Sequence, residues 1–236
     1  MTLLAVEGLE KRFGGVQALA GLSLSLDEGG LLCLLGPNGC GKTTFFRVLS
    51  GETAADAGRI DFADRRLEGE GPAGRARLGI ARKLQTPGLF AALTVAEHLA
   101  LAAASPAAHG PVDAAALLAR VGLGEHAETP AGRLSHGQRQ WLEIAMLLAL
   151  RPRLLLLDEP TAGMTRAETR RTAALLRELN DKDGVAAIVI EHDMAFVREL
   201  DVAVAVMLQG RVVATGSYAE VGRDPLVREL YLGKRA

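Results

Sequence analysis

The chain reads Gly36-Pro37-Asn38-Gly39-Cys40-Gly41-Lys42-Thr43 directly after the apolar run Leu31 to Leu35. The spacing is G-x-x-x-x-G-K-[ST], and the residues from Thr43 to Leu49 have helical character. When a buried strand, a glycine loop and a helix follow one another, backbone N–H groups and the positive end of the helix can surround a phosphate chain. The stretch therefore predicts a phosphate-binding loop (P-loop) in an α/β fold, and it disfavours an accidental glycine-rich turn.

Within the loop, the residue types suit ATP together with Mg²⁺. Lys42 can reach the β- and γ-phosphates, and the Thr43 hydroxyl can bind Mg²⁺. Cys40 stands at a variable position of the loop, so no chemistry is assigned to its thiol. The residues expected to line the nucleotide here are Gly36, Asn38, Gly39, Cys40, Gly41, Lys42, Thr43 and Thr44.

A second half of such a site follows the apolar run Leu154 to Leu157, which ends at Asp158-Glu159. A carboxylate at the end of a buried strand beside a P-loop holds Mg²⁺, and this role falls to Asp158. Glu159 is then placed to act as general base on the attacking water. Taken alone, the acidic pair would indicate a solvated cap after a strand, but the P-loop upstream favours metal and base.

The rest of the chain alternates strand and helix patterns. Leu22 to Leu26 alternates as a half-buried strand does, and residues 165–180 follow the pattern of an amphipathic helix. Apolar strands are expected at 185–190 and 202–208, and Gln209-Gly210 turns the second of them into a hairpin. This order predicts a largely parallel sheet that is covered on both faces.

Three segments differ in texture from this pattern. Residues 87–150 are rich in Ala and Leu at helical spacing, which predicts a helical insertion between two strands of the core. Residues 63–77 are polar and rich in glycine, and we expect them to form a surface loop. From residue 224 to residue 236 we expect a short docking helix that begins at Pro225.

The composition limits the number of domains and the kinds of partner that the chain can have. The chain has 236 residues, a net charge of −1 and 49% hydrophobic residues, which suits one α/β domain and does not favour a nucleic-acid partner. Its start lacks a signal peptide, and its apolar runs are too short to span a bilayer, so a soluble protein is expected, with any membrane role supplied by a partner. Cys33 and Cys40 are expected to stay reduced in a cytoplasm.

The segment Leu134-Ser135-His136-Gly137-Gln138 closely resembles the signature motif of ABC ATPases. The resemblance covers essentially the whole chain. It implies a P-loop NTPase with a mostly parallel core sheet, an N-terminal antiparallel β portion and an inserted helical subdomain. On this basis residues 1–236 form one nucleotide-binding domain, with a RecA-like core (1–86 and 151–236) and a helical signature subdomain (87–150).

The same resemblance implies roles for several more residues. Gln85 would sense Mg²⁺ and take part in catalysis with Lys42, and His192 would orient the attacking water or the γ-phosphate beside Glu159. Taken alone, His192 would be read as a surface or capping group. The remaining residues implied in nucleotide binding are Phe13, Val16, Ser135, Gly137 and Gln138, with Phe13 stacking on adenine and the last three reaching the ATP of a second subunit.

Two positions depart from the common pattern of the family. His136 stands where glycine is commonest, and Thr165 stands where aspartate usually does. Phe13 to Val16, Arg82 to Pro87, Leu93 to Leu99 and the closing Tyr231-Leu232-Gly233 resemble the branched-chain amino acid uptake group. Within that group, the segments Leu134 to Ile144 and Asp158 to Thr165, which contain these two positions, look most like the ATP-binding subunit of the urea importer. The implied partners are a second ABC ATPase subunit, membrane permeases and an external solute-binding protein.

The leading prediction is therefore an ATP-hydrolysing motor of a solute importer, with ATP and Mg²⁺ as cofactors, at the cytoplasmic face of a bacterial inner membrane. Urea or short amides are the expected solute, and branched-chain amino acids are the alternative. A non-transport ABC ATPase is a further alternative, but such proteins usually have two domains or long arms. A P-loop small-molecule kinase does not fit the signature motif.

Overall fold

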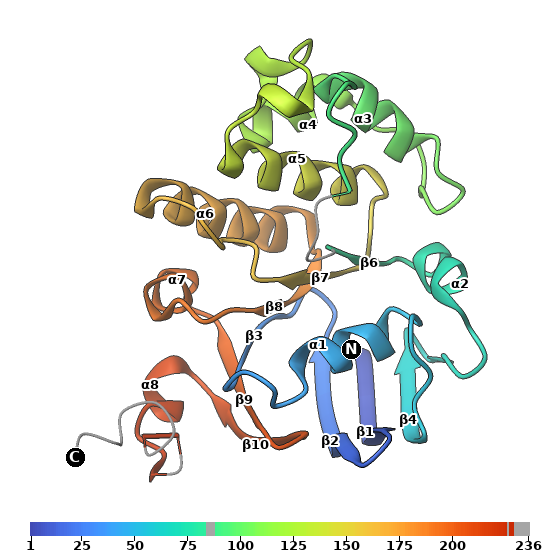
Figure 1. The fold of residues 1–236 in the computed structure, drawn as a ribbon, viewed down its shortest axis with the longest axis vertical. Coiled ribbons are helices and arrows are strands. Elements are labelled where there is room, and N and C mark those ends of the chain that lie inside the picture. The colour runs from blue at the N-terminus through green and yellow to red at the C-terminus, as the bar shows by residue number, and fades with distance from the viewer. Residues whose placement is uncertain (84–87, 226, 229–236) are drawn as a thin grey trace.

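The computed structural model describes residues 1–83, 88–225 and 227–228, which form two β-sheets and a set of helices (Figure 1). The larger sheet has the strand order β10-β9-β3-β8-β7-β6. Its strands β6, β7, β8, β3 and β9 run parallel, whereas β10 pairs antiparallel with β9 as a hairpin. Their bounds are β3 Leu31–Leu35, β6 Ile80–Arg82, β7 Leu154–Asp158, β8 Ala186–Ile190, β9 Ala203–Leu208 and β10 Arg211–Gly216.

The second sheet is antiparallel and is built from the start of the chain. Its order is β2-β1-β4-β5, with bounds β1 Thr2–Phe13, β2 Val16–Asp27, β4 Ala57–Phe62 and β5 Arg65–Arg66. Side chains alternate between buried and exposed along much of β2, as expected for a strand with one face in the core. The expected N-terminal antiparallel portion and the mostly parallel sheet are both confirmed.

One helix, α1 (Lys42–Leu49), lies between the two sheets. Its Phe45 and Phe46 are fully buried in a cluster that includes Leu4 of β1 as well as Leu34 and Leu156 of the parallel sheet. Because α1 is packed from both sides, the loop at its N-terminus is held in a fixed place between the sheets.

The opposite face of the parallel sheet is covered by other helices. A second apolar cluster joins α5 (His136–Ala149) and α6 (Arg166–Asp183) to Leu155 and Val189 of the sheet. Helices α3 (Val95–Ala103) and α4 (Ala114–Val121) stack on α5 at one end of the molecule (Figure 1). The remaining helical elements are α2 Pro72–Arg77, α7 Met194–Leu200, α8 Tyr218–Val221 and 3₁₀ turns at Gly124–His126 and Ala131–Arg133.

The prediction of a surface loop over 63–77 is wrong for half of that segment. Its second part forms α2, and Arg75 of that helix is buried. The Arg75 guanidinium donates to the backbone carbonyls of Val48, Leu49 and Leu67. A polar segment therefore packs inward here because the Arg75 guanidinium finds backbone carbonyl acceptors, which the hydropathy pattern does not reveal.

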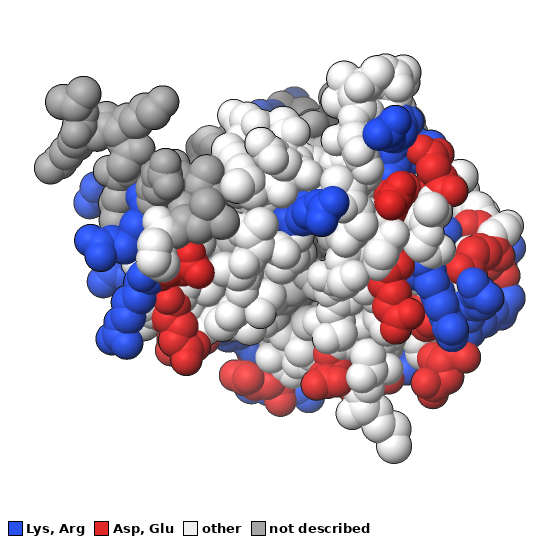
Figure 2. Space-filling view, turned by 90° about the horizontal axis from the view of Figure 1, so that it is seen from below, with Lys and Arg blue, Asp and Glu red and all other residues white. Residues whose placement is uncertain are grey.

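The surface charge and the apolar helices relate to the expectations about a nucleic-acid partner and about membrane spans. On the face that Figure 2 shows, acidic and basic side chains of the described residues lie intermixed around a largely uncharged centre. No helix among the described residues is long and apolar enough to cross a membrane. The expected C-terminal docking helix lies largely outside the described residues.

Candidate functional site

The P-loop connects β3 to α1, as expected, and two of its glycines are required by space. A Cβ at Gly36 would lie 2.3 Å from the Met207 carbonyl oxygen, and one at Gly41 would lie 2.2 Å from that of Ala18. Gly41 also has a φ of 109°, in the region that favours glycine. The loop is thus wedged between β9 and β2, and its backbone can approach a ligand closely.

Lys42 is buried and holds the loop together from inside. Its Nζ donates to the Gly36 carbonyl at 2.6 Å and to the Pro37 carbonyl at 3.0 Å. It also lies 3.8 Å from the Cys40 sulfur. Burial raises the pKa of the Cys40 thiol, although the Lys42 charge opposes the shift. A phosphate chain in the loop offers this ammonium stronger acceptors than neutral carbonyls do.

Asp158 ends β7 and is 2% exposed. Burial raises the pKa of its carboxyl group, while the Arg82 charge and a hydrogen bond from Thr43 lower it. Among the described residues, its buried Oδ2 has no hydrogen-bond partner. A buried carboxylate with a free oxygen beside a threonine hydroxyl is chemically suited to Mg²⁺.

The described residues contain no cluster of three or more His, Cys, Asp or Glu side chains that could hold a metal by itself. In P-loop proteins, Mg²⁺ is bound by substrate phosphates with only one or two protein groups. Thr43 and Asp158 are the described candidates for such groups. Gln85, the third residue expected at the metal, lies outside the described residues.

Glu159 and His192 are brought together where two neighbouring parallel strands end. Glu159 has a φ of 47° and its backbone N–H donates to the Ile190 carbonyl at 2.9 Å, which turns the chain sharply after β7. His192 follows β8, and its Nε2 lies 3.3 Å from Glu159 Oε1. Both side chains remain partly exposed, so a water molecule can reach the pair.

Glu191, to which no sequence motif assigns a role, is 4% exposed beside this pair. Its carboxylate accepts from the Thr161 hydroxyl at 2.6 Å, from the Thr161 backbone N–H at 3.1 Å and from the His192 backbone N–H at 3.1 Å. Burial raises its pKa, and these hydrogen bonds oppose the shift. The sequence feature that could have indicated this residue is a glutamate directly after the apolar run 185–190.

The signature residues form the start of α5. Ser135 caps the helix by accepting from the Gln138 backbone N–H, and the Gln138 side chain accepts from the Ser135 N–H in return. Among the described residues, the side-chain hydrogen bonds of Ser135 and Gln138 link them to each other and to His126, and none reaches the P-loop. The two groups pack on opposite faces of the parallel sheet, α1 on one and α5 on the other.

Phe13 and Val16 face each other across the β1–β2 turn and are 47% and 67% exposed. The Lys11 ammonium lies 5.4 Å from the centre of the Phe13 ring. Further along β2, Ala18 borders Gly41 of the P-loop. Phe13 ends β1, the strand that pairs with β2, and an exposed aromatic ring at this turn can stack on a base.

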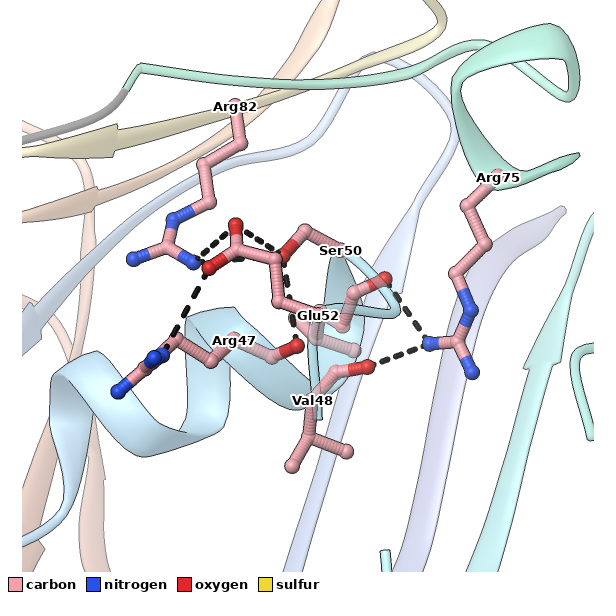
Figure 3. Close-up of polar contacts among 7 residues, drawn as sticks. Arg47, Val48, Ser50, Glu52, Arg75 and Arg82 are labelled. Atoms are coloured by element: carbon pink, nitrogen blue, oxygen red, sulfur yellow. Dashed lines mark hydrogen bonds and ion pairs between the residues drawn. The ribbon is translucent and has the colours of Figure 1, made fainter. Parts of the chain in front are cut away.

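A polar cluster fixes the far end of α1 (Figure 3). Arg82 of β6 pairs with Glu52 at 2.7 Å and with the Ser50 hydroxyl at 3.3 Å, and Arg47 lies 3.6 Å from Glu52. Arg75 approaches the same end from α2 and binds its last carbonyls. Cations at a helix C-terminus are favourable, so this cluster stabilises the helix that begins at the P-loop.

This fold, with a P-loop that faces an acidic strand end, defines the class of P-loop ATPases. Two family models agree with a narrower assignment. One, described as ABC transporter, matches residues 19–162, and the other, described as branched-chain amino acid ATP-binding cassette transporter, matches residues 211–236. The chain belongs to the ABC transporter family and is an ATP-hydrolysing subunit of a transporter.

Similar proteins narrow this further. The chain is 38% identical over 250 residues to the high-affinity branched-chain amino acid transport ATP-binding protein LivG of Salmonella typhimurium, with 98% of each chain covered. It is 35% identical to the corresponding protein BraF of Pseudomonas aeruginosa over the same shares. These relatives are named for branched-chain amino acids and not for urea.

Solved structures show the same fold. A nucleotide-free ATP-binding cassette of an ABC transporter matches with a TM-score of 0.89 and 30% identity, covering 99% of this chain and 100% of that one. A cassette in its ADP conformation matches with a TM-score of 0.88 and 30% identity over the same shares. That cassette binds an adenine nucleotide, ADP, as expected for an ATPase of this family.

Proposed function

We propose that this chain is the motor ATPase of an importer for branched-chain amino acids, acting at the cytoplasmic face of a bacterial inner membrane. The observation that carries the proposal is the contact between Glu159 and His192, whose Oε1 and Nε2 atoms lie 3.3 Å apart, next to Asp158. Glu159 and His192 follow β7 and β8 in the sheet whose strand β3 leads into the P-loop. The whole-length similarity to LivG and BraF supports the solute class.

In this proposal the P-loop binds ATP by its backbone and by Lys42. Mg²⁺, when bound, neutralises charge on the phosphates, with Thr43 and the free oxygen of Asp158 as its protein ligands. Glu159 takes a proton from the attacking water, and His192 orients the reacting groups. Phe13 and Val16 stack against the base, and Gln85 keeps the role that the family resemblance implies, as a further metal ligand.

The signature residues need a second subunit in this scheme. Ser135 and Gly137 lie on the helix that packs against the other face of the sheet from α1, so they reach an ATP only in a facing copy or a related chain. Permease subunits and an external solute-binding protein complete the proposed importer. One of the solved relatives is described as a dimeric ABC transporter cassette, which supports a pair of such domains.

Urea or short amides remain a second candidate for the solute. The sequence feature that favours them is the combination of His136 in the signature with Thr165 in the loop after β7. In the structure both residues have defined contacts, since His136 binds the Ala162 carbonyl and Thr165 caps α6. Both residues therefore have a structural role, and they can serve to distinguish a subgroup of the family.

The test is uptake of labelled leucine and labelled urea in cells that lack this gene, with and without the gene restored. Loss of leucine uptake that returns on restoration supports the proposal, whereas loss of urea uptake alone assigns the second candidate. If neither changes, both solutes are wrong. Restoring the gene as Glu159→Gln separates ATP hydrolysis from assembly, because this variant should join the complex and leave uptake absent.

A further inference from the structure

His136 makes a hydrogen bond that has no role in the nucleotide site as described above. It is the first residue of α5, and its Nε2 lies 2.8 Å from the carbonyl oxygen of Ala162. A carbonyl can only accept a hydrogen bond, so the proton is on Nε2 of the imidazole. The bond joins the signature segment to the loop of residues 161–165, which directly follows Glu159 and Pro160 and leads into α6.

Glycines around this hydrogen bond leave room for the His136 ring. Gly163 has a φ of 74°, and a Cβ there would lie 3.1 Å from the His136 ring. At the next residue of α5, a Cβ on Gly137 would lie 2.3 Å from a carboxylate oxygen of Glu168, whose side chain caps α6. Gly163 thus allows the 161–165 loop to approach α5 closely, and Gly137 does the same for the start of α6.

The 161–165 loop is already attached at both of its ends. Thr161 is bound by Glu191, the residue next to His192, and Thr165 forms a capping box with Glu168. Only the middle of the loop depends on His136. The helices themselves are held together elsewhere, because the Trp141 indole donates to the Thr172 hydroxyl at 3.0 Å inside the apolar cluster. Removing the imidazole should therefore loosen the loop without unfolding α5 or α6.

We propose that His136 is a positioning residue for ATP hydrolysis, which holds the 161–165 loop, and through it Glu159, in register with Ser135 of the same chain. This inference rests on the proposed function. Its consequence is that the signature of one subunit, which would contact the facing subunit's ATP, is rigidly tied to the general base of its own subunit. Movement at one nucleotide would then reach the other partly through this side chain, beside the Trp141–Thr172 hydrogen bond that joins α5 and α6.

The test compares three variants of the full chain. His136→Leu removes the donor, His136→Gln keeps an amide donor of similar reach, and His109→Leu is the matched control on an exposed loop. In His136→Leu, amide hydrogen exchange over residues 161–165 should quicken roughly 2- to 10-fold, the size of one ordinary hydrogen bond. Exchange in the control and in His136→Gln should stay close to that of the unchanged protein.

The same variants are then assembled with their permeases, and ATP hydrolysis is followed against ATP concentration. For His136→Leu we expect kcat to fall about 5- to 50-fold with little change in KM, because the loss is of alignment and not of ATP binding. His136→Gln should restore most of the rate. A merely structural role would lower the unfolding temperature and the affinity for ATP as well.

Two results would overturn the inference. One is unchanged exchange and unchanged kcat in His136→Leu, and the other is faster exchange with an unchanged kcat. Lys42→Ala and Glu159→Gln are measured in parallel to separate causes. If these two also hydrolyse ATP normally, the proposed function itself fails; if they are inactive while His136→Leu is normal, only the role of His136 is wrong.

Discussion

At the scale of single residues, the proposed general base is Glu159. Its carboxylate is partly exposed, turned by a positive φ toward the end of β8 and 3.3 Å from His192. Replacing it by Gln removes the base and keeps the shape, so ATP hydrolysis should fall roughly 10²- to 10⁴-fold. Binding of a fluorescent ATP analogue should be retained. The exposed Glu125→Gln is the control, and equal turnover in both variants would show that Glu159 is not the base.

The buried Glu191 leads to a prediction about how the stability of the fold depends on pH, because burial raises the pKa of its carboxyl group above the ordinary 4.5. A carboxyl group whose pKa is higher in the folded chain binds its proton more tightly there, so its contribution to stability is largest at low pH. That contribution declines as pH rises from 4.5 through the raised folded pKa. The free energy of unfolding of the unchanged protein minus that of Glu191→Gln should therefore fall over this window. Urea denaturation at a series of pH values measures it, and a difference that rises with pH contradicts the assignment.

The residue scale also shows what sequence could predict of the site. Lys42, Asp158 and Glu159 were predicted because fixed spacing after a buried strand dictates where each side chain lies. His192 was supplied by the family resemblance, and the structure brings it beside Glu159. Glu191 was missed because an apolar run does not say which way its last, charged residue points. Its burial depends on Thr161, thirty positions earlier in the chain.

At the scale of elements, strands and helices with a clear period were predicted within a few residues, and short or polar ones were not. The strand at 154–157 and the helix at 165–180 correspond to β7 and α6. β6, with three residues, is too short to show a period and exists because it pairs with β7. α2 was missed because its inward contacts are made by Arg75 and not by an apolar stripe.

Arg75 accordingly makes α2 and the end of α1 depend on one another. Arg75→Met keeps most of the side-chain volume but leaves buried carbonyls of Val48, Leu49 and Leu67 without a donor. We expect the free energy of unfolding to fall by about 3 kcal/mol, the scale of buried polar groups left unsatisfied. Urea denaturation at constant m-value measures this, with the exposed Arg77→Met of the same helix as control. Similar losses in the two variants would mean that the buried contacts of Arg75 contribute little.

At the scale of the whole molecule, the core sheet and the helical segment are joined by a buried ion pair. Lys83, directly after β6, lies 3.1 Å from the Glu143 carboxylate of α5, and both side chains are almost fully buried. The pair therefore connects the strand next to β7 with the helix that begins at the signature. The division at residues 86 and 150 between core and helical part remains a prediction, and the energetics of this contact bear on how firmly the two parts are held.

A double-mutant cycle on Lys83 and Glu143 tests that connection. Lys83→Met alone leaves a buried carboxylate without its counter-charge, and Glu143→Met alone leaves a buried ammonium. Each should lower the free energy of unfolding by about 3–5 kcal/mol. The double variant buries two methionines of suitable length and should lie within about 1 kcal/mol of the unchanged protein, because the cost of desolvating both charges disappears with their attraction. Chemical denaturation of all four proteins measures the coupling. If the single losses simply add in the double variant, the two charges do not interact, and the helical segment is held on the core by its other contacts, such as the apolar cluster and the Trp141–Thr172 hydrogen bond.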